Sequence, residues 1–184
     1  MSPQVKLLAA LRFYATGSIY GVIGDAHGPS KDSIGRAIKQ VTKAINLYMF
    51  QQLVKYPSNF DNTTTGFFEK GGIPSIFGCI DGTLIKILAP SKYEEQFVDR
   101  KNEHSLNVML VCGPNLKFYD ASVRWPGATH DARVFKNSKL CERLQNGWRP
   151  FTGAILLGDS GNTFNPTFNP TIEGEFTPKI SLII

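Results

Sequence analysis

The first third of the chain places its apolar residues at helical spacing. The opening "MSPQVKLLAALRFYA" carries four large apolar side chains on one face of a helix, namely Leu7, Leu8, Leu11 and Tyr14. A further helix is expected after Ser30, whose side-chain hydroxyl is suited to capping a helix N-terminus. Its core-facing positions repeat every three or four residues, as Ile34, Ile38, Val41, Ile45 and Tyr48. We therefore expect residues 1–56 to form a small all-helical segment.

A separate basic stripe runs along the same expected helix and consists of Arg36, Lys39 and Lys43. Two helices, a Gly-containing turn and a following helix with basic positions are typical of a helix-turn-helix that binds DNA. A helical hairpin that binds nothing has the same periodicity. Both interpretations stay open on the spacing alone.

The pattern changes to strands after residue 72. Residues 57–72, which include "PSNFDNTTTG", are rich in turn formers and are expected to be a linker. Apolar runs then predict strands that end at Asp81, in "GTLIKIL", in "HSLNVMLVCG", in "FYDASVRWPG" and in "GAILLGDSG". Asp81-Gly82 is a turn dipeptide, so the first two of these strands are expected to form a tight hairpin. A helix with Thr129 as its N-cap is expected before the last strand.

This order of elements predicts an α/β domain over residues 73–161, with a mixed sheet and flanking helices. Residues 162–184 contain an Asn-Pro-Thr near-repeat and show no helical period. We expect those residues to form an irregular tail.

Three aspartates stand at the ends of expected elements. Asp81 and Asp159 each follow an apolar strand, and Asp131 lies at a helix start. Side chains at the carboxyl ends of neighbouring strands meet at one edge of a sheet. Two carboxylates about 4 Å apart repel by about 4 kcal/mol at an effective dielectric constant of 20, so such a pair requires a shared proton or a cation.

The residues around the aspartates favour the cation. A shared proton is the arrangement of aspartic proteases, which use two similar loops, whereas the flanks of Asp81 and Asp159 differ. Oxygen ligands alone are typical of Mg²⁺ or Mn²⁺. Taken singly, each aspartate also fits a turn or a helix start, as Asp131 does through the helix dipole.

Composition and charge are those of a globular protein with a basic surplus. Hydrophobic residues make up 42% of the chain, charged residues 19%, and the net charge is +5. Such a surplus is compatible with a polyanionic partner, and Arg100 and Lys101 in "RKNEHSLN" are candidates to contact a phosphate backbone. The three cysteines have no metal-finger spacing, and no apolar run is long enough to span a membrane.

Five stretches resemble the Harbinger transposase-derived nucleases, the DDE endonucleases of the PIF/Harbinger superfamily. In order, they are "LLAALRFYATGS", "GCIDGTLIKILAPS", "RKNEHSLNVMLVC", "ASVRWPGATHDARVFKNSKL" and "ILLGDSG". The resemblance runs from about residue 3 to 161. It implies an RNase H-like catalytic domain in which Asp81, Asp131 and Asp159 hold a divalent cation, Mg²⁺ or Mn²⁺. It also implies DNA as a partner, a Myb-like DNA-binding partner protein, and a location in the nucleus.

The chain departs from the family pattern beyond "GDSG". The family's last catalytic residue is a glutamate on a helix several tens of residues further on, and this chain ends before that position. Glu173 and Glu175 come too early and lie in no helical pattern. We therefore expect a metal-dependent DNA endonuclease of transposon origin whose catalysis is impaired. The alternatives are a catalytically inactive DNA- or partner-binding protein of the same origin, and a fragment that does not fold stably.

Overall fold

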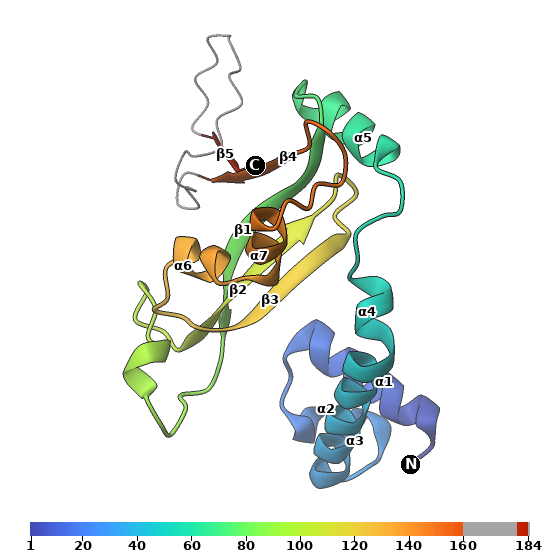
Figure 1. The fold of residues 1–184 in the computed structure, drawn as a ribbon. Coiled ribbons are helices and arrows are strands. Elements are labelled where there is room, and N and C mark those ends of the chain that lie inside the picture. Colours follow the sequence, from blue (N-terminus) through green and yellow to red (C-terminus); the bar gives the residue numbers. More distant parts are fainter. Residues whose placement is uncertain (160–179, 184) are drawn as a thin grey trace. The chain divides into compact units, whose positions relative to one another are not determined.

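A computed structural model describes residues 1–159 and 180–183 of the chain (Figure 1). The chain divides into two compact units, Met1–Leu53 and Val54–Ile184. Each unit has its own cluster of buried apolar side chains.

The first unit is all-helical, as predicted. It contains α1 (Pro3–Thr16), α2 (Tyr20–His27) and α3 (Lys31–Ala44), which continues through a π-helical turn (Ile45–Met49) into α4 (Phe50–Leu53). The Ser30 hydroxyl caps α3 by accepting a hydrogen bond from the backbone N–H of Ser33, at 3.4 Å. The core of the unit consists of Ala9, Ala10, Ile23, Ile34 and Ile38.

Two predictions for this unit are wrong in their details. The apolar face of α1 is about half exposed at Leu7, Leu8 and Leu11, because the small Ala9 and Ala10 are the residues that α1 buries. Tyr48 is also exposed, whereas Ile34 and Ile38 are buried as predicted. The π-helical turn at Ile45–Met49 has more residues per turn than an α-helix, which rotates Tyr48 out of the apolar stripe.

The second unit is built on a mixed sheet with the strand order β3-β2-β1-β4-β5. The strands are β1 (Ile76–Lys86), β2 (Ser105–Cys112), β3 (Phe118–Pro126), β4 (Ile155–Asp159) and β5 (Ile180–Ile183). β1 pairs with β4 in parallel, and the other neighbours pair antiparallel. Helices α5 (Asp61–Gly71), α6 (Asp131–Lys136) and α7 (Lys139–Gln145) flank the sheet, and a 3₁₀ turn spans Glu94–Phe97. This confirms the predicted α/β, RNase H-like fold.

The predicted hairpin at Asp81-Gly82 is wrong. β1 runs without interruption through both residues, with Asp81 paired to Leu110 and Gly82 paired to Met109 on β2. Asp81 therefore lies in the middle of a strand and not at its end. The turn dipeptide is overridden by the pairing with β2, which continues on both sides of it.

Helix α5 occupies most of the segment that the sequence predicts to be a linker. Its Thr63 hydroxyl lies 3.1 Å from the Tyr119 hydroxyl, and both residues are buried. Phe60, just before the helix, packs edge-on against Phe77. These contacts with the sheet stabilise regular structure in a segment whose composition suggests turns.

Two further boundaries differ from the sequence predictions. The helix expected after Thr129 is two helices, in which His130 precedes α6 as its N-cap and Ser138 caps α7. The apolar end of the predicted irregular tail forms β5 at Ile180–Ile183, paired with β4. Residues 160–179 lie outside the described part of the chain.

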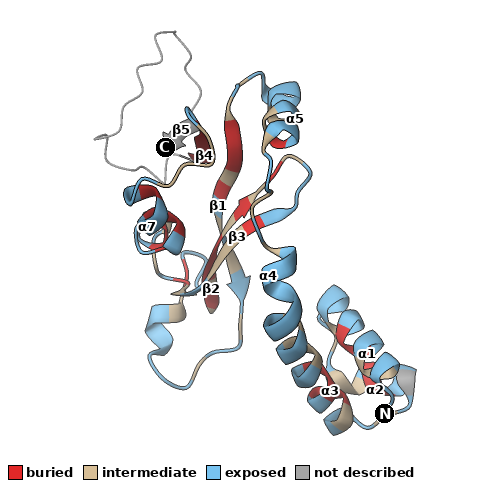
Figure 2. Cartoon of the chain, turned by 45° about the vertical axis from the view of Figure 1, so that its right-hand side comes forward, coloured by how far each residue is buried: buried red, intermediate tan, exposed pale blue. Residues whose placement is uncertain are grey.

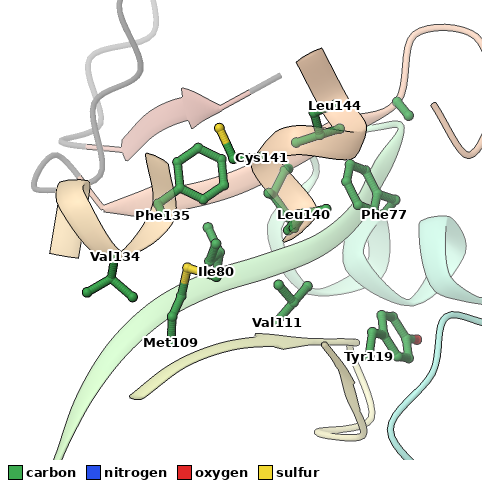
Figure 3. Close-up of a cluster of buried hydrophobic side chains, with 12 residues drawn as sticks. Phe77, Ile80, Met109, Val111, Tyr119, Val134, Phe135, Leu140, Cys141 and Leu144 are labelled. Carbon is green, nitrogen blue, oxygen red and sulfur yellow. The ribbon is translucent and has the colours of Figure 1, made fainter. Parts of the chain in front are cut away.

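The core of the second unit lies between the sheet and helices α6 and α7. Figure 3 shows Ile80, Met109 and Val111 of β1 and β2 on the side of the sheet where Phe135 and Leu140 come down from the helices. Buried positions concentrate along β1, β2 and α7, whereas α5 is largely exposed (Figure 2). Among the described helices, none combines the length and the apolarity needed to cross a membrane.

Replacing Phe77 with alanine is expected to destabilise the protein by about 3–5 kcal/mol, because it leaves a cavity in the core. Phe77 is 1% exposed and contacts Tyr56, Phe60 and Trp148. Leu88→Ala is the control, since Leu88 is 94% exposed and its loss should cost less than about 0.5 kcal/mol. Chemical denaturation measures both changes, and equal destabilisation by the two variants would contradict this description of the core.

Candidate functional site

Asp81 presents an exposed carboxylate in the middle of β1. Its Oδ1 accepts a hydrogen bond from the backbone N–H of Gly82 at 2.8 Å. Gly78 and Ile80, which precede Asp81 on the same strand, are buried, whereas Asp81 is exposed. The strand therefore leaves the core as it reaches Asp81. An exposed carboxylate on a strand anchored at one end is held in place while it stays accessible to a cation.

Asp159 lies at the neighbouring position on the parallel strand. The register pairs Cys79 with Leu157 and Ile80 with Gly158, so the next residues along the two strands are Asp81 and Asp159. Asp159 is the last residue of β4, as the sequence predicts. The structure describes the backbone of Asp159 and not its side chain. The structure thus meets the condition under which the two strand positions come together, because β1 and β4 are neighbours.

Asp131 reaches the sheet one residue further along β1, at Gly82. A Cβ placed on Gly82 would lie 2.3 Å from Oδ1 and 2.6 Å from Cγ of Asp131. The same Oδ1 accepts a hydrogen bond from Asn107 Nδ2 at 2.6 Å. The Asp131 carboxylate therefore lies directly against the backbone of β1, in the space that a side chain at residue 82 would fill.

The side chain of Asp81 and the carboxylate of Asp131 lie on opposite faces of β1. Successive residues of a strand point to opposite faces, so the side chain of Asp81 points away from the face that Asp131 covers at Gly82. Asn107 and Met109 of β2 are on the Asp131 face, because Asn107 bonds Asp131 and Met109 belongs to the core beneath α6.

The opposite face carries Asp81 together with Cys79 and Cys112, which are register partners with free thiols. Burial raises the pKa of Cys79 to about 11, and the nearby Cys112 adds to that effect. The pKa of Cys112 is raised by burial and, next, by the Asp81 carboxylate. The register pairs Cys79 with Cys112, and Asp81 follows Cys79 by two residues, so all three positions belong to one face of the sheet.

The candidate ligands for a cation are therefore the residues at two adjacent strand positions, Asp81 on β1 and Asp159 on β4. Within the part of the chain that the structure describes, no group of three or more His, Cys, Asp or Glu side chains is arranged to hold a metal ion. Oxygen donors at Asp81 and Asp159 fit the chemistry of Mg²⁺ or Mn²⁺. The roles of Asp81, Asp131 and Asp159 as metal ligands stay predictions.

A cavity of about 520 Å³ opens on the Asp131 face. Its lining includes Gly82 and Asn107 from the sheet, Asp131 with the loop before it, and the two basic residues Arg100 and Lys101. Both basic residues are exposed. The cavity thus has a polar floor and a positively charged rim, which suits a phosphate-bearing ligand.

The loop that carries Arg100 and Lys101 is held by a carboxylate that the sequence did not single out. Asp99 is buried, its Oδ1 accepts from the backbone N–H groups of Lys101 and Glu103, and its Oδ2 accepts from the Ser105 hydroxyl at 2.8 Å. The Ser105 bond, followed by these backbone bonds, holds the pKa of Asp99 below its usual range, although burial opposes the shift.

The second predicted DNA-binding group is on α3 in the first unit. Arg36, Lys39 and Lys43 are all exposed, while Ile34 and Ile38 of the same helix are buried. The predicted basic stripe is therefore separate from the core face of the helix. Its contact with DNA stays a prediction.

Asn107 and Gly82 are site residues that sequence reasoning missed. Asn107 is 3% exposed and stands inside the apolar run "SLNVMLVC". A polar side chain at a buried strand position requires hydrogen-bond partners, which was the available signal. Gly82 had no such signal, because Asp-Gly is explained just as well by a turn.

Asp99 makes a specific pH dependence expected. A carboxyl group whose pKa is lowered by folding stabilises the protein above its ordinary pKa, and this contribution disappears as the pH falls through the folded-state pKa. The stability difference between wild type and Asp99→Asn should therefore be largest near neutral pH and shrink between about pH 5 and about pH 2. Urea denaturation across this range measures it, and a difference that does not change with pH would contradict the assignment.

Comparison with known proteins places the chain among endonucleases. The profile of the DDE superfamily endonucleases matches residues 80–179. The chain is 32% identical, over 163 residues, to the proteins named "Putative nuclease HARBI1" of Rattus norvegicus and Homo sapiens, and 25% identical over 190 residues to "Protein ALP1-like" of Arabidopsis thaliana.

These matches cover 87% and 96% of this chain but 46% and 47% of the relatives, so the chain spans about half the length of the curated relatives it matches. No solved structure matches it significantly. The range that matches this family begins at Ile80, directly before Asp81, and includes Asp131 and Asp159. On its sequence and its mixed sheet, the chain belongs to the DDE superfamily endonucleases.

Proposed function

We propose that this chain is a metal-dependent DNA endonuclease domain of transposon origin, in which Asp81 and Asp159 hold Mg²⁺ or Mn²⁺. The observation that carries the proposal is the parallel register of β1 and β4, which gives the two aspartates adjacent positions on neighbouring strands. Membership of the DDE superfamily endonucleases supports the reaction class. The proposal includes action in the nucleus together with a Myb-like partner, as the family resemblance implies.

The chemistry follows from the charge of the pair. Two carboxylates on adjacent strands repel each other by about 4 kcal/mol at an effective dielectric constant of 20 and a separation of about 4 Å, and a bound cation reverses the sign of that energy. A divalent cation there supplies activation of a water or hydroxyl and stabilisation of the leaving oxygen at phosphorus. Asp81 and Asp159 hold and orient it, and the exposure of Asp81 leaves the position open to a DNA strand.

The basic residues account for binding of the polyanion. Arg100 and Lys101 lie at the rim of a polar cavity on a loop fixed by Asp99. The α3 stripe adds three exposed cations in the other unit. Phosphate contacts of this kind give affinity without sequence selection.

A catalytically inactive DNA-binding protein of the same origin is the second candidate. The observation in its favour is that the described residues include no group of three or more His, Cys, Asp or Glu side chains arranged to hold a metal ion. This candidate retains the basic groups and owes nothing to Asp81. Metal binding therefore separates the two proposals.

Asp81→Asn is expected to lower the Mn²⁺ affinity more than tenfold and to abolish Mn²⁺-dependent nicking of supercoiled plasmid, because a neutral amide cannot balance the charge of the cation. Isothermal titration calorimetry and gel electrophoresis measure the two effects. The control is Glu69→Gln, which removes an exposed carboxylate on α5. Equal Mn²⁺ binding by wild type and Asp81→Asn would favour the inactive candidate.

Replacing both Arg100 and Lys101 with alanine should weaken binding to any DNA sequence and reduce the slope of log K against log [salt] by about 2, about one for each lost phosphate contact. Fluorescence anisotropy at several salt concentrations measures the slope. Lys117→Ala provides a control with an exposed lysine in the turn between β2 and β3. An unchanged slope in the double variant would remove this loop from the DNA interface.

A further inference from the structure

We propose that Asp131 is a positioning residue and not a third ligand of the cation. Its carboxylate packs against β1 at Gly82, on the face opposite Asp81, and so fixes the strand that carries Asp81. The inference rests on the proposed function, because it assigns a role toward the same ion. It separates Asp131 from Asp81 and Asp159, with which the sequence groups it.

The first observation is the contact with Gly82. All three atoms nearest to a Cβ at this position belong to the Asp131 carboxylate, at 2.3, 2.6 and 3.0 Å. Real side chains essentially never approach so closely, so glycine is required here for as long as the carboxylate stays. A side chain at the residue after Asp81 would therefore require the carboxylate of Asp131, which lies on a different element, to move.

The second observation is that the Asp131 carboxylate is tied down on its own face of the sheet. Asn107 Nδ2 donates to Asp131 Oδ1 at 2.6 Å and to the backbone oxygen of Thr129 at 2.8 Å. Asn107 is almost fully buried, and it belongs to β2, the antiparallel neighbour of β1. One amide therefore joins β2 to the loop and the first residue of α6, which leaves the carboxylate clamped between two strands.

The third observation concerns direction. Strand alternation and the β1–β2 register place Asp81 on the face of Cys79 and Cys112, whereas the Asp131 carboxylate is on the face of Asn107 and the α6 core. To bind an ion on the face of Asp81, the Asp131 carboxylate would have to leave Gly82 and Asn107. Its observed position instead prevents β1 from shifting toward α6 just beside Asp81.

The test uses the whole chain and measures Mn²⁺ affinity by isothermal titration calorimetry, with a thermal melt of each variant. The variants are Asp131→Asn, Asp81→Asn, Gly82→Ala, and Gly82→Ala combined with Asp131→Ala. Asp131→Asn keeps the shape and an oxygen acceptor for Asn107 but removes the charge that a ligand would need. The double variant relieves the collision between a methyl group at residue 82 and the carboxylate.

A positioning role predicts that Asp131→Asn binds Mn²⁺ within about threefold of wild type, while Asp81→Asn loses more than tenfold. Gly82→Ala should lower the affinity by about tenfold or more, as disturbances behind a metal site commonly do. Asp131→Ala should restore most of that loss in the Gly82→Ala background. Removing a true ligand cannot raise metal affinity, so rescue of binding is a result that a ligand role does not produce.

Three outcomes overturn the inference. If Asp131→Asn loses as much Mn²⁺ affinity as Asp81→Asn, Asp131 is a ligand. If the double variant binds Mn²⁺ no more tightly than Gly82→Ala, the contact between Asp131 and Gly82 does not affect the metal site. Wild type that does not bind Mn²⁺ overturns the proposed function itself, and the inference with it. If Gly82→Ala fails to fold and the double variant folds and binds Mn²⁺, the rescue supports the inference in the same way.

Discussion

Parallel strands cannot be joined by a tight turn, and the pairing of β1 with β4 is the constraint on which the site depends. The chain between them builds β2, β3, α6 and α7, and the two helices return over the sheet and form its core. Only this return makes the positions of Asp81 and Asp159 adjacent, although they are far apart in sequence. The core around Phe77 and Ile80 therefore determines the geometry of the candidate metal site.

The contact of Asp131 with Gly82 links the same helices to the strand more directly. α6 begins at Asp131, and its first carboxylate lies against the backbone of β1, held by Asn107 from β2. The residues that pack the core and the residue that contacts β1 thus lie on the same short helix. We expect a disturbance of α6 packing at Val134 or Phe135 to reach the strand beside Asp81 through this contact.

Sequence periodicity was sufficient for the fold class, and it located the buried stripe of α3 at Ile34 and Ile38. It also singled out Asp81 and Asp159, since apolar runs that end in a carboxylate are a local signal, but the adjacency of their strands comes from the structure. It failed where the cause lies elsewhere in the chain. The Asp-Gly pair looks like a turn, but Gly82 is glycine to admit Asp131, and the role of Asn107 depends on a loop that follows β3. The prediction of an apolar face at Leu7 and Leu11 failed for a different reason, because α1 buries the small residues Ala9 and Ala10 instead.

The central claim is that one face of β1 holds the ion while the other face holds the carboxylate that supports the strand. Anomalous diffraction at the manganese edge, from crystals grown with Mn²⁺, locates the ion directly. The account predicts a peak within coordination distance, about 2.0–2.3 Å, of an Asp81 carboxylate oxygen, with Asp131 still bonded to Asn107 across the sheet. A peak coordinated by Asp131, or crystals with Mn²⁺ present and no peak at Asp81, would contradict it.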